Sequence, residues 1–255
     1  MWTIILFFIA HWYLSLFFQT FFMHRYAAHG MFTMSKRNER IFQVLSWIFM
    51  GSNYLSPFGY GVMHRMHHAF ADTSKDPHSP SFDENIFKMM WKTKIIYSSI
   101  TKKQYIPESR FTENVPDWPL FDRIATSWVS RVGWGALYTL VYIQFAPSIY
   151  WYALLPLQWA LAPIHGAIIN WFAHTYGYVN FKVGGTSKNF LPFDFLMMGE
   201  SYHNNHHKHG NRANFGGIRW HEIDPTYLII RIFNSLGIVK LNRMNEQKIS
   251  VRKAA

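Results

Sequence analysis

The sequence contains no cysteine among its 255 residues. Disulfides, thiolate zinc sites and cysteine-ligated iron–sulfur clusters are therefore excluded, and any bound metal must be held by nitrogen and oxygen ligands. Charged residues make up only 15% of the chain, against roughly 25% in an ordinary soluble protein. Aromatic residues reach 19%, and the mean hydropathy is −0.07. This composition favours apolar blocks that are joined to a substantial polar part.

Acidic residues are also scarce, because 14 Asp and Glu face 25 Lys and Arg, which gives a net charge of +11. Such a balance is typical of proteins that meet nucleic acid, anionic lipid or an acidic partner. Residues 1–24 and 132–181 carry no formal charge. A span needs ~20 apolar residues, so the first stretch predicts one span and the second predicts two. The first stretch lacks the basic start and the small-residue cleavage site of a signal peptide.

The distribution of positive charge predicts a topology. All 25 Lys and Arg lie in 25–131 and 182–255, and the positive-inside rule makes both segments cytoplasmic. We therefore expect spans at about 1–23, 132–147 and 149–174, with the N-terminus outside. The basic charge then forms a cytoplasmic, membrane-facing surface, so we expect contact with the lipid bilayer and no nucleic acid.

The block 41–63 is long enough to span a membrane, but small polar residues and Pro57 interrupt its second half. A single crossing would place 64–131 on the wrong side, so we expect this block to be interfacial or re-entrant. Residues 64–131 and 182–255 then form a cytoplasmic cap. No repeat or linker divides the chain. The predicted fold is one domain over 1–255, an all-α, multi-span integral membrane helical bundle with a cytoplasmic helical cap.

Histidines gather in three clusters, which read HRYAAH (24–29), HRMHH (64–68) and HNNHH (203–207). The second and third share the spacing i, i+3, i+4, which on a helix places three imidazoles on one face and directs them to one point. The i, i+5 pair of the first cluster predicts a helix end or a distortion. A lone histidine is commonly a structural residue, but this repeated spacing favours a metal site. Imidazole suits iron, copper, zinc and nickel, so the spacing does not name the metal.

The segment NWFAH holds a quieter pair, Asn170 and His174, at the cytoplasmic end of the last predicted span. Alone it would be a polar pair in helix packing. Beside eight other histidines it offers a ninth imidazole and an amide that could hold a metal-bound water. Eight or nine imidazoles exceed what one ion takes, so we expect a dinuclear metal site in the cap.

Together these segments carry a resemblance. HRMHHAFADTSKDPHSP (64–80), NWFAHTYG (170–177) and GESYHNNHH (199–207), with the first cluster before them, resemble the membrane fatty acyl desaturases over nearly the whole chain. The resemblance is to the acyl-lipid and acyl-CoA Δ9-type branch in a bacterial form. It implies two iron ions (Fe2+) and dioxygen as co-substrate, in an enzyme that introduces a cis double bond into a saturated acyl chain.

The resemblance also implies roles for particular residues. Asn170 would hold a metal-bound water, and the iron ligands would be His24, His29, His64, His67, His68, His174, His203, His206 and His207. Three acids, Asp72, Asp76 and Glu200, are candidates to orient these imidazoles, unless they are ordinary solvated or capping acids. Arg25 and Arg65 lie beside ligands, where they would neutralise acids or meet an anionic headgroup.

The sequence holds no haem-binding HPGG segment and no GxGxxG nucleotide motif. The two electrons per turnover must therefore come from outside, and we expect a ferredoxin or b-type cytochrome, with its reductase, on the basic face. The acyl carrier would be CoA, acyl carrier protein or a phospholipid. We expect a bacterial inner-membrane location with the active site on the cytoplasmic side. Only 23 residues precede His24, where desaturases usually carry a hairpin, so a partner helix or a dimer is expected.

Two other interpretations remain open. A hydroxylase, ketolase or alkane oxygenase would share the histidine clusters and differ only in its product. A metal transporter would place its ligands near the bilayer midplane between repeats, whereas these ligands are predicted at one end and no repeat is visible. Histidines at 11, 78, 165, 209 and 221 are expected outside the ligand set, with His78 as a simple loop residue.

Overall fold

The computed structural model describes residues 2–242. The part of the predicted cap beyond residue 242 lies outside the described residues. The described chain is mostly helical, as the sequence predicts, with one short antiparallel pair of strands. In chain order the elements are α1 (Trp2–Phe18), the π-helix η1 (Gln19–Ala28), β1 (Phe32–Thr33), α2 (Lys36–Met50), η2 (Gly51–Asn53), α3 (Pro57–Phe70), α4 (Ile86–Thr101), α5 (Ser109–Thr112), α6 (Pro119–Ala125), α7 (Trp128–Phe145), η3 (Ile149–Leu154), α8 (Leu155–Trp159), α9 (Leu161–Ala167), the π-helix η4 (Ile168–Phe172), α10 (Ala173–Thr175), α11 (His203–Lys208), α12 (Pro225–Ser235) and β2 (Lys240–Leu241).

The first helix runs without a break from α1 into η1, because no charge, glycine or proline interrupts it before residue 24. Its second part is π-helical, with hydrogen bonds that span five residues, such as that from His29 N–H to the His24 carbonyl at 3.2 Å. A π-turn therefore supplies the distortion that the i, i+5 spacing of His24 and His29 predicts. The helix leads directly from the long apolar segment to the histidines.

The block 41–63 is not one helix but comprises the end of α2, η2 and the start of α3. Its interfacial or re-entrant placement stays a prediction. Helix α2 ends at Gly51, whose φ is +55° and where a Cβ would overlap the Tyr138 hydroxyl. A new helix, α3, begins at Pro57, and its N-terminus is capped by the Ser56 hydroxyl, which accepts the Gly59 N–H at 3.3 Å. The second half of the block thus opens the helix that carries the second histidine cluster.

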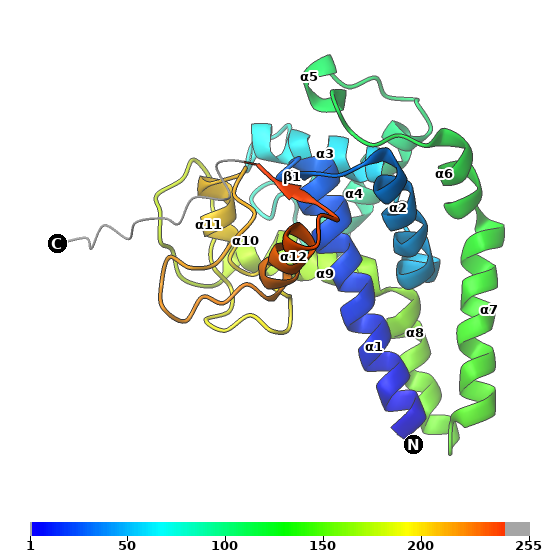
Figure 1. Ribbon diagram of the computed structural model, residues 1–255. Helices are drawn as coiled ribbons and strands as arrows, with labels where there is room; N and C mark the ends of the chain where they lie inside the picture. Colours follow the sequence, from blue (N-terminus) through cyan, green and yellow to red (C-terminus); the bar gives the residue numbers. More distant parts are fainter. Residues whose placement is uncertain (1, 243–255) are drawn as a thin grey trace.

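The charge-free block 132–181 forms a straight helix, α7, and a bent return segment. The chain turns at residues 146–148, and Ile149–Trp159 meets Leu161–Thr175 at an angle of 63°. Pro156 and Pro163 lie on the two sides of this bend, as expected for residues that remove a helical N–H. In Figure 1, α1, α7 and α8 extend together away from the rest of the molecule, with the N-terminus and the 146–148 turn at their far end.

Within the described residues, one helix is long and apolar enough to cross a membrane, the continuous Trp2–Ala28 segment of 27 residues. The bent pair Ile149–Thr175 adds a second if it counts as one span. The structure therefore shows the predicted helical fold, whereas the predicted number of crossings and the division into spans and cap remain predictions.

The remaining elements gather at the other end of the first helix (Figure 1). Strand β2 pairs with β1 through Phe32 and Leu241, which ties the end of the described chain to the segment after η1. The largest apolar core surrounds η1 and includes Phe21, Phe22 and Phe215. Helix α12 packs on this core through Ile230 and exposes an apolar face elsewhere. This core fixes the π-helix against which the histidine-bearing helix α3 packs.

Candidate metal centre

All nine histidines that the resemblance implies as ligands lie close together in the structure, although they come from four separate parts of the chain. They form two groups in which the facing ring atoms all lie within 4.8 Å of one another. Group 1 consists of His24, His29, His64, His68 and His206, and group 2 consists of His67, His174, His203 and His207. Six of the nine side chains are buried and the other three are half-buried.

The two HxxHH clusters do not each point at a single position, which corrects the expectation from their spacing. In α3, His64 and His68 join group 1 while His67 joins group 2. In α11 the division is reversed, because His203 and His207 join group 2 and His206 joins group 1. Residues at i and i+4 lie nearly above one another on a helix, whereas i+3 is offset to the side. Each cluster therefore straddles two adjoining groups.

The distances between ring nitrogens fit metal coordination. In group 1, His24 Nε2 lies 3.0 Å from His206 Nε2, and His64 Nε2 lies 2.9 Å from His29 Nε2. In group 2, His203 Nε2 lies 3.0 Å from the Nε2 atoms of both His174 and His207. Ligands bonded at ~2.1 Å to one ion and at right angles to each other would be ~3.0 Å apart. The donor set therefore fits two nitrogen-ligated transition-metal ions.

Three carboxylates contact the opposite side of the imidazoles. Glu200 Oε2 lies 2.6 Å from His24 Nδ1, and both oxygens of Asp76 lie within 3.0 Å of His67 Nδ1. Asp72 Oδ2 lies 3.3 Å from His174 Nδ1. A carboxylate at Nδ1 holds the proton there, so the Nε2 lone pair of each ring faces its group. Asp72, Asp76 and Glu200 are the three acids that the sequence reasoning singles out.

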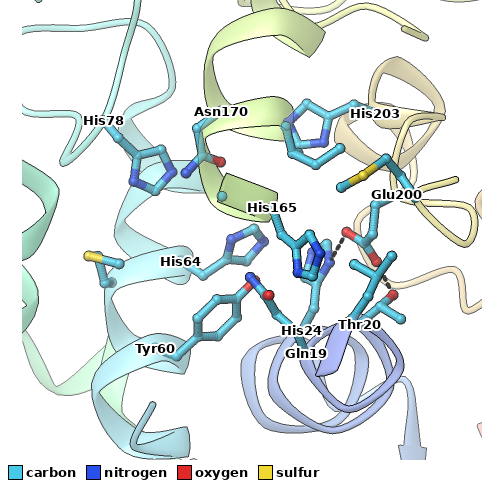
Figure 2. Close-up of a pocket in the computed structure, with 15 residues that line it drawn as sticks. Gln19, Thr20, His24, Tyr60, His64, His78, His165, Asn170, Glu200 and His203 are labelled. Atoms are coloured by element: carbon cyan, nitrogen blue, oxygen red, sulfur yellow. Dashed lines mark hydrogen bonds and ion pairs between the residues drawn. The ribbon is translucent and has the colours of Figure 1, made fainter. Parts of the chain in front are cut away.

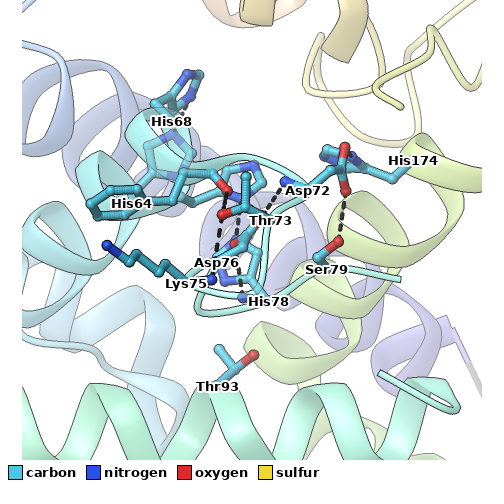
Figure 3. A network of polar contacts seen from close by, with 12 residues as sticks. His64, His68, Asp72, Thr73, Lys75, Asp76, His78, Ser79, Thr93 and His174 are labelled. Atoms are coloured by element: carbon cyan, nitrogen blue, oxygen red, sulfur yellow. Dashed lines mark hydrogen bonds and ion pairs between the residues drawn. The ribbon is translucent and has the colours of Figure 1, made fainter. Parts of the chain in front are cut away.

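The loop after α3 places two of these acids (Figure 3). Asp76 also accepts the backbone N–H groups of Asp72 and His78, and Asp72 accepts the Ser79 hydroxyl at 2.7 Å. Because its carboxylate is occupied by these donors and by His67, Asp76 has no oxygen left for an ion shared with His67 and His78, although the three side chains are close. The loop therefore positions histidines of the two metal groups and does not form a third metal site.

The two arginines have structural contacts. Arg25 is fully buried, donates to Asp224 Oδ2 at 2.8 Å, and stacks its guanidinium on the Phe215 ring at 3.9 Å. It also forms an ion pair with Glu200 at 3.4 Å. Arg65 donates to the backbone carbonyls of Ala28 and Glu113. Arg25 therefore neutralises acids, as one of the two expected roles requires, while Arg65 joins η1 to the segment after α5.

Burial decides the charge of the histidines. Removal from water, together with the neighbouring imidazoles, holds the pKa values of His64, His68, His203, His206 and His207 well below their usual range. Burial also lowers the pKa of His67 to about 3. Near neutral pH these rings are therefore uncharged, which is the form that binds metal. Glu200 shows the opposite balance, since His24 and Arg25 outweigh its burial and lower its pKa.

The third histidine cluster is held by a network of amides and one acid. Asn205 donates to Glu222 Oε2 at 3.0 Å and to the Phe215 carbonyl at 2.9 Å. Asn204 donates to the carbonyls of Phe181 and Ser187, both at 3.0 Å. The two asparagines between His203 and His206 thus anchor α11, a helix of only six residues, and this leaves the three imidazoles free to face the groups.

A small cavity of about 50 Å³ adjoins both groups, with His24 and His64 of group 1 and His203 of group 2 in its wall. Asn170, which begins the NWFAH segment, lines it from η4 (Figure 2). Two histidines that were expected outside the ligand set, His78 and His165, also line it and belong to neither group. His78 is a loop residue as expected, but it is buried and stacks on His67 with ring centroids 4.4 Å apart.

Sequence reasoning gave no role to these two residues. For His165 a signal existed, because an ionisable residue inside a charge-free block is a functional candidate by default. For His78 no signal in the sequence shows that the loop folds back under α3. His209 and His221 lie outside both groups, and His209 packs against the Phe181 ring.

The fold and the site define a helical protein with two adjoining histidine groups that are compatible with two transition-metal ions. The model of the family described as fatty acid desaturase matches residues 1–233. The chain therefore belongs to the fatty acid desaturase family, a membrane-associated family, and it is an oxidoreductase of the desaturase class.

Curated relatives agree with this family. The chain is 29% identical over 246 residues to "Delta-9 desaturase-like 5 protein" of Arabidopsis thaliana, with 91% of this chain and 75% of the relative covered. It is 28% identical over 242 residues to the sn-1 stearoyl-lipid 9-desaturase of Synechocystis, with 91% and 69% covered. It is also 28% identical over 219 residues to an acyl-CoA 5-desaturase of Anemone leveillei, with 84% and 64% covered.

Proposed function

We propose that this protein is a membrane-bound, non-haem di-iron desaturase that introduces a cis double bond into a saturated fatty acyl chain, at the Δ9 position. The substrate would be an acyl-CoA, an acyl carrier protein thioester or an acyl lipid, and the co-substrates would be dioxygen and two external electrons. The observation that carries the proposal is the pair of adjoining all-histidine groups in a chain of the desaturase family.

Iron is the metal that fits both the donors and the family. The chain has no cysteine, so thiolate ligands are excluded, and imidazole suits iron as it suits copper, zinc and nickel. The family favours iron among these. His24, His29, His64, His68 and His206 would hold one ion, and His67, His174, His203 and His207 would hold the other. When bound, the two ions would activate dioxygen to remove two hydrogen atoms from neighbouring methylene carbons, which no side chain can deprotonate.

The protein's own residues would prepare this site. Glu200, Asp76 and Asp72 hold the protons of three imidazoles at Nδ1, so that Nε2 is a free ligand atom. Asn170 lies in the wall of the cavity that adjoins both groups, where its amide would hold a metal-bound water. The apolar side chains Leu16, Met63, Ile169 and Met197 line the same cavity, where they would contact the reacting methylenes.

The sequence contains neither a haem-binding HPGG segment nor a nucleotide-binding GxGxxG motif, so the electrons would come from another protein. They would enter at the basic cytoplasmic surface. A ferredoxin or a b-type cytochrome, reduced by its own reductase, is the class of donor that an excess of positive charge would attract. The location that follows is a bacterial inner membrane with the site on the cytoplasmic side.

The test is the fatty-acid profile of a desaturase-deficient host that expresses the wild type, His206→Ala or His209→Ala. His206 belongs to group 1, whereas His209 belongs to neither group and serves as the matched control. We expect a Δ9 cis alkene with the wild type and His209→Ala, and a loss of at least 100-fold with His206→Ala, because a buried ligand is removed. An oxygenated product without a new alkene would identify a hydroxylase instead.

A further inference from the structure

The cavity beside the metal groups is small and is lined by both polar and apolar side chains. Its volume of about 50 Å³ is room for about three or four water molecules at ~10–15 Å³ of this measure each. Its wall contains imidazoles, two amides, a carboxylate and a tyrosine besides four apolar side chains. Figure 2 shows Gln19, His165 and Asn170 directed into this space from η1, α9 and η4.

Several polar atoms that face the cavity are buried without a hydrogen-bond partner among the described residues. His78 and His165 are 2% and 1% exposed, and neither ring nitrogen of either residue is paired. Gln19 Oε1 is also buried and unpaired. Protein interiors satisfy nearly all such atoms with protein or ordered water, since an unpaired buried polar atom is destabilising. The Trp12 ring packs on His165 at 4.5 Å in a T-shaped contact and donates its own N–H to the Leu196 carbonyl.

The polar side chains continue away from the cavity along one face of the first helix. His11, Ser15 and Gln19 follow each other at i, i+4 and i+8, a spacing that places them in one row. Ser15 is fully buried, and its hydroxyl has no partner among the described residues. Such a row is unexpected in an apolar helix, because each buried polar group has a desolvation cost.

The far end of this row is hydrogen-bonded to α7. His11 Nε2 lies 3.3 Å from the Tyr138 hydroxyl, which in turn accepts the Ser52 N–H at 3.2 Å. The Ser52 carbonyl accepts the half-exposed Arg131 guanidinium at 2.6 Å. Helix α1 packs against α7, α8 and α9, so the row lies within the helical bundle. Polar groups therefore lie between the cavity and the molecular surface, although Ser15 Oγ and Gln19 Oε1 have no hydrogen-bond partner among the described residues.

We propose that the cavity binds ordered water, held by His165, His78 and Gln19, and that this water continues along the His11–Ser15–Gln19 row as a path to the surface. The proposal rests on the proposed function for its role. In that reaction two C–H bonds break, dioxygen takes up those two hydrogens, two external electrons and two protons, and two water molecules form. A buried site with apolar walls needs a route for these protons and for the water that it makes.

The first test measures the water directly. Purified protein in lipid nanodiscs is exposed to X-ray pulses in 18O-labelled water, and the incorporation of 18O into methionines is followed by mass spectrometry. Met197 and Met31 are both fully buried, but only Met197 lines the cavity. We expect Met197 to be oxidised several-fold faster than Met31, because hydroxyl radicals form from the adjacent water. Equal and slow oxidation of the two would overturn the proposal.

The second test removes the polar lining. In the double variant Gln19→Leu with His165→Leu, we expect oxidation of Met197 to fall to the rate of Met31 while two metal ions per chain are retained. The alkene formed per dioxygen consumed should fall several-fold, with the difference released as hydrogen peroxide. Gln43→Leu, which removes a fully buried amide on α2 outside the cavity, is the matched control. It should change neither quantity.

The outcomes separate the two proposals. A dry cavity would make the double variant more heat-stable than the wild type, because unpaired polar groups are replaced by apolar ones, and this would overturn the water site. An unchanged ratio of alkene to dioxygen would overturn the path. If no form of the protein makes an alkene while Met197 is still labelled, the proposed function fails and the water site stands.

Discussion

At the scale of single residues, the centre depends on which nitrogen of each imidazole faces a carboxylate and which faces a metal group. His24, His67 and His174 give Nδ1 to a carboxylate and Nε2 to a metal group. In the absence of a cation, their Nε2 lone pairs face other ring nitrogens at about 3 Å, as His24 faces His206 at 3.0 Å. The carboxylates hold the proton at Nδ1 of these three rings and so select the form that binds metal through Nε2.

The variant Asp76→Asn tests whether the carboxylate at Nδ1 contributes to metal binding. The substitution keeps the shape of the side chain but removes the charge beside His67 Nδ1. We expect the metal affinity of group 2 to fall about 10- to 100-fold while group 1 is unaffected, because the orienting carboxylate contributes that much in metalloproteins. Competition with a chelator of known affinity measures the change.

The matched control is Asp83→Asn, in the same loop, where the carboxylate pairs with Lys92 and faces no metal group. Its metal affinity should equal that of the wild type. If both variants bound metal with equal affinity, the contact of Asp76 with His67 would not contribute to metal binding.

Sequence reasoning reached the residues of this centre but not their arrangement. The repeated HxxHH spacing identifies the side chains, because few other purposes need so many imidazoles. It does not show that His67 and His206 each join the group opposite to their neighbours. That division depends on the angle between α3 and α11, which is set by tertiary contacts such as those of Asn204 and Asn205.

At the scale of elements, the contact between α3 and η1 holds the first two histidine clusters together. Gly61 lies in this contact, where a Cβ would be 3.1 Å from the Ala27 carbonyl oxygen and 3.0 Å from a methyl of Val115. Because the nearest atom of Ala27 is in the backbone, the contact cannot relax by a change of rotamer. A side chain at this position would push the two helices apart by a few tenths of an ångström.

Gly61→Ala should therefore lower the free energy of unfolding by about 1–2 kcal/mol, since overpacking costs about 1–3 kcal/mol and alanine returns up to about 1 kcal/mol of helix propensity. The shift of α3 should also weaken metal binding by group 1. Thermal unfolding of the detergent-solubilised protein, with and without iron, measures both effects.

Gly133→Ala in α7 is the control, because nothing lies within 4 Å of the added Cβ. This variant should be as stable as the wild type or slightly more stable. If Gly61→Ala behaved in the same way, the close contact would not be a constraint on the site.

The elements also show where sequence patterns were sufficient. The charge-free segments form the long helices, and the i, i+5 spacing of His24 and His29 corresponds to a π-helix. In the block 41–63, Ser56 and Pro57 interrupt the apolar run because together they are the signal that starts a helix, α3. The composition of the block masked that signal, because its mean hydropathy does not depend on where a helix begins.

At the scale of the whole molecule, the buried histidines with lowered pKa values, such as His67, His203 and His207, impose a pH dependence on the metal-free protein. In the folded state burial lowers the pKa of His67 to about 3 and holds those of its neighbours well below their usual range. In the unfolded chain the same rings titrate near 6.5. Between these values the unfolded state binds more protons than the folded state, so stability rises with pH.

The metal-free protein should therefore lose stability as the pH falls below about 6.5. Each histidine that stays neutral in the fold contributes a slope of about 1.4 kcal/mol per pH unit. Thermal unfolding of chelator-treated protein between pH 7.5 and pH 5 measures this slope. His67→Phe should reduce it, whereas His221→Phe, which is half-buried and outside both groups, should not. A midpoint that is independent of pH would contradict the neutral cluster.

The histidines outside the ligand set could be assigned only from the folded chain. His78 and His165 are 87 residues apart (165 − 78) in sequence, yet both line one cavity. Their meeting depends on the loop after α3 and on the bend before α9, which no local pattern specifies. The row of His11, Ser15 and Gln19 is visible in the sequence, but its meaning follows from the burial of its far end against Tyr138.

The most direct test of the account is the iron content of purified protein, measured per chain by mass spectrometry against amino-acid analysis. The wild type and His209→Ala should hold two irons per chain. His206→Ala, in group 1, and His203→Ala, in group 2, should each hold at most one. An iron content that is the same in all four proteins would contradict the assignment of the two histidine groups as the metal centre.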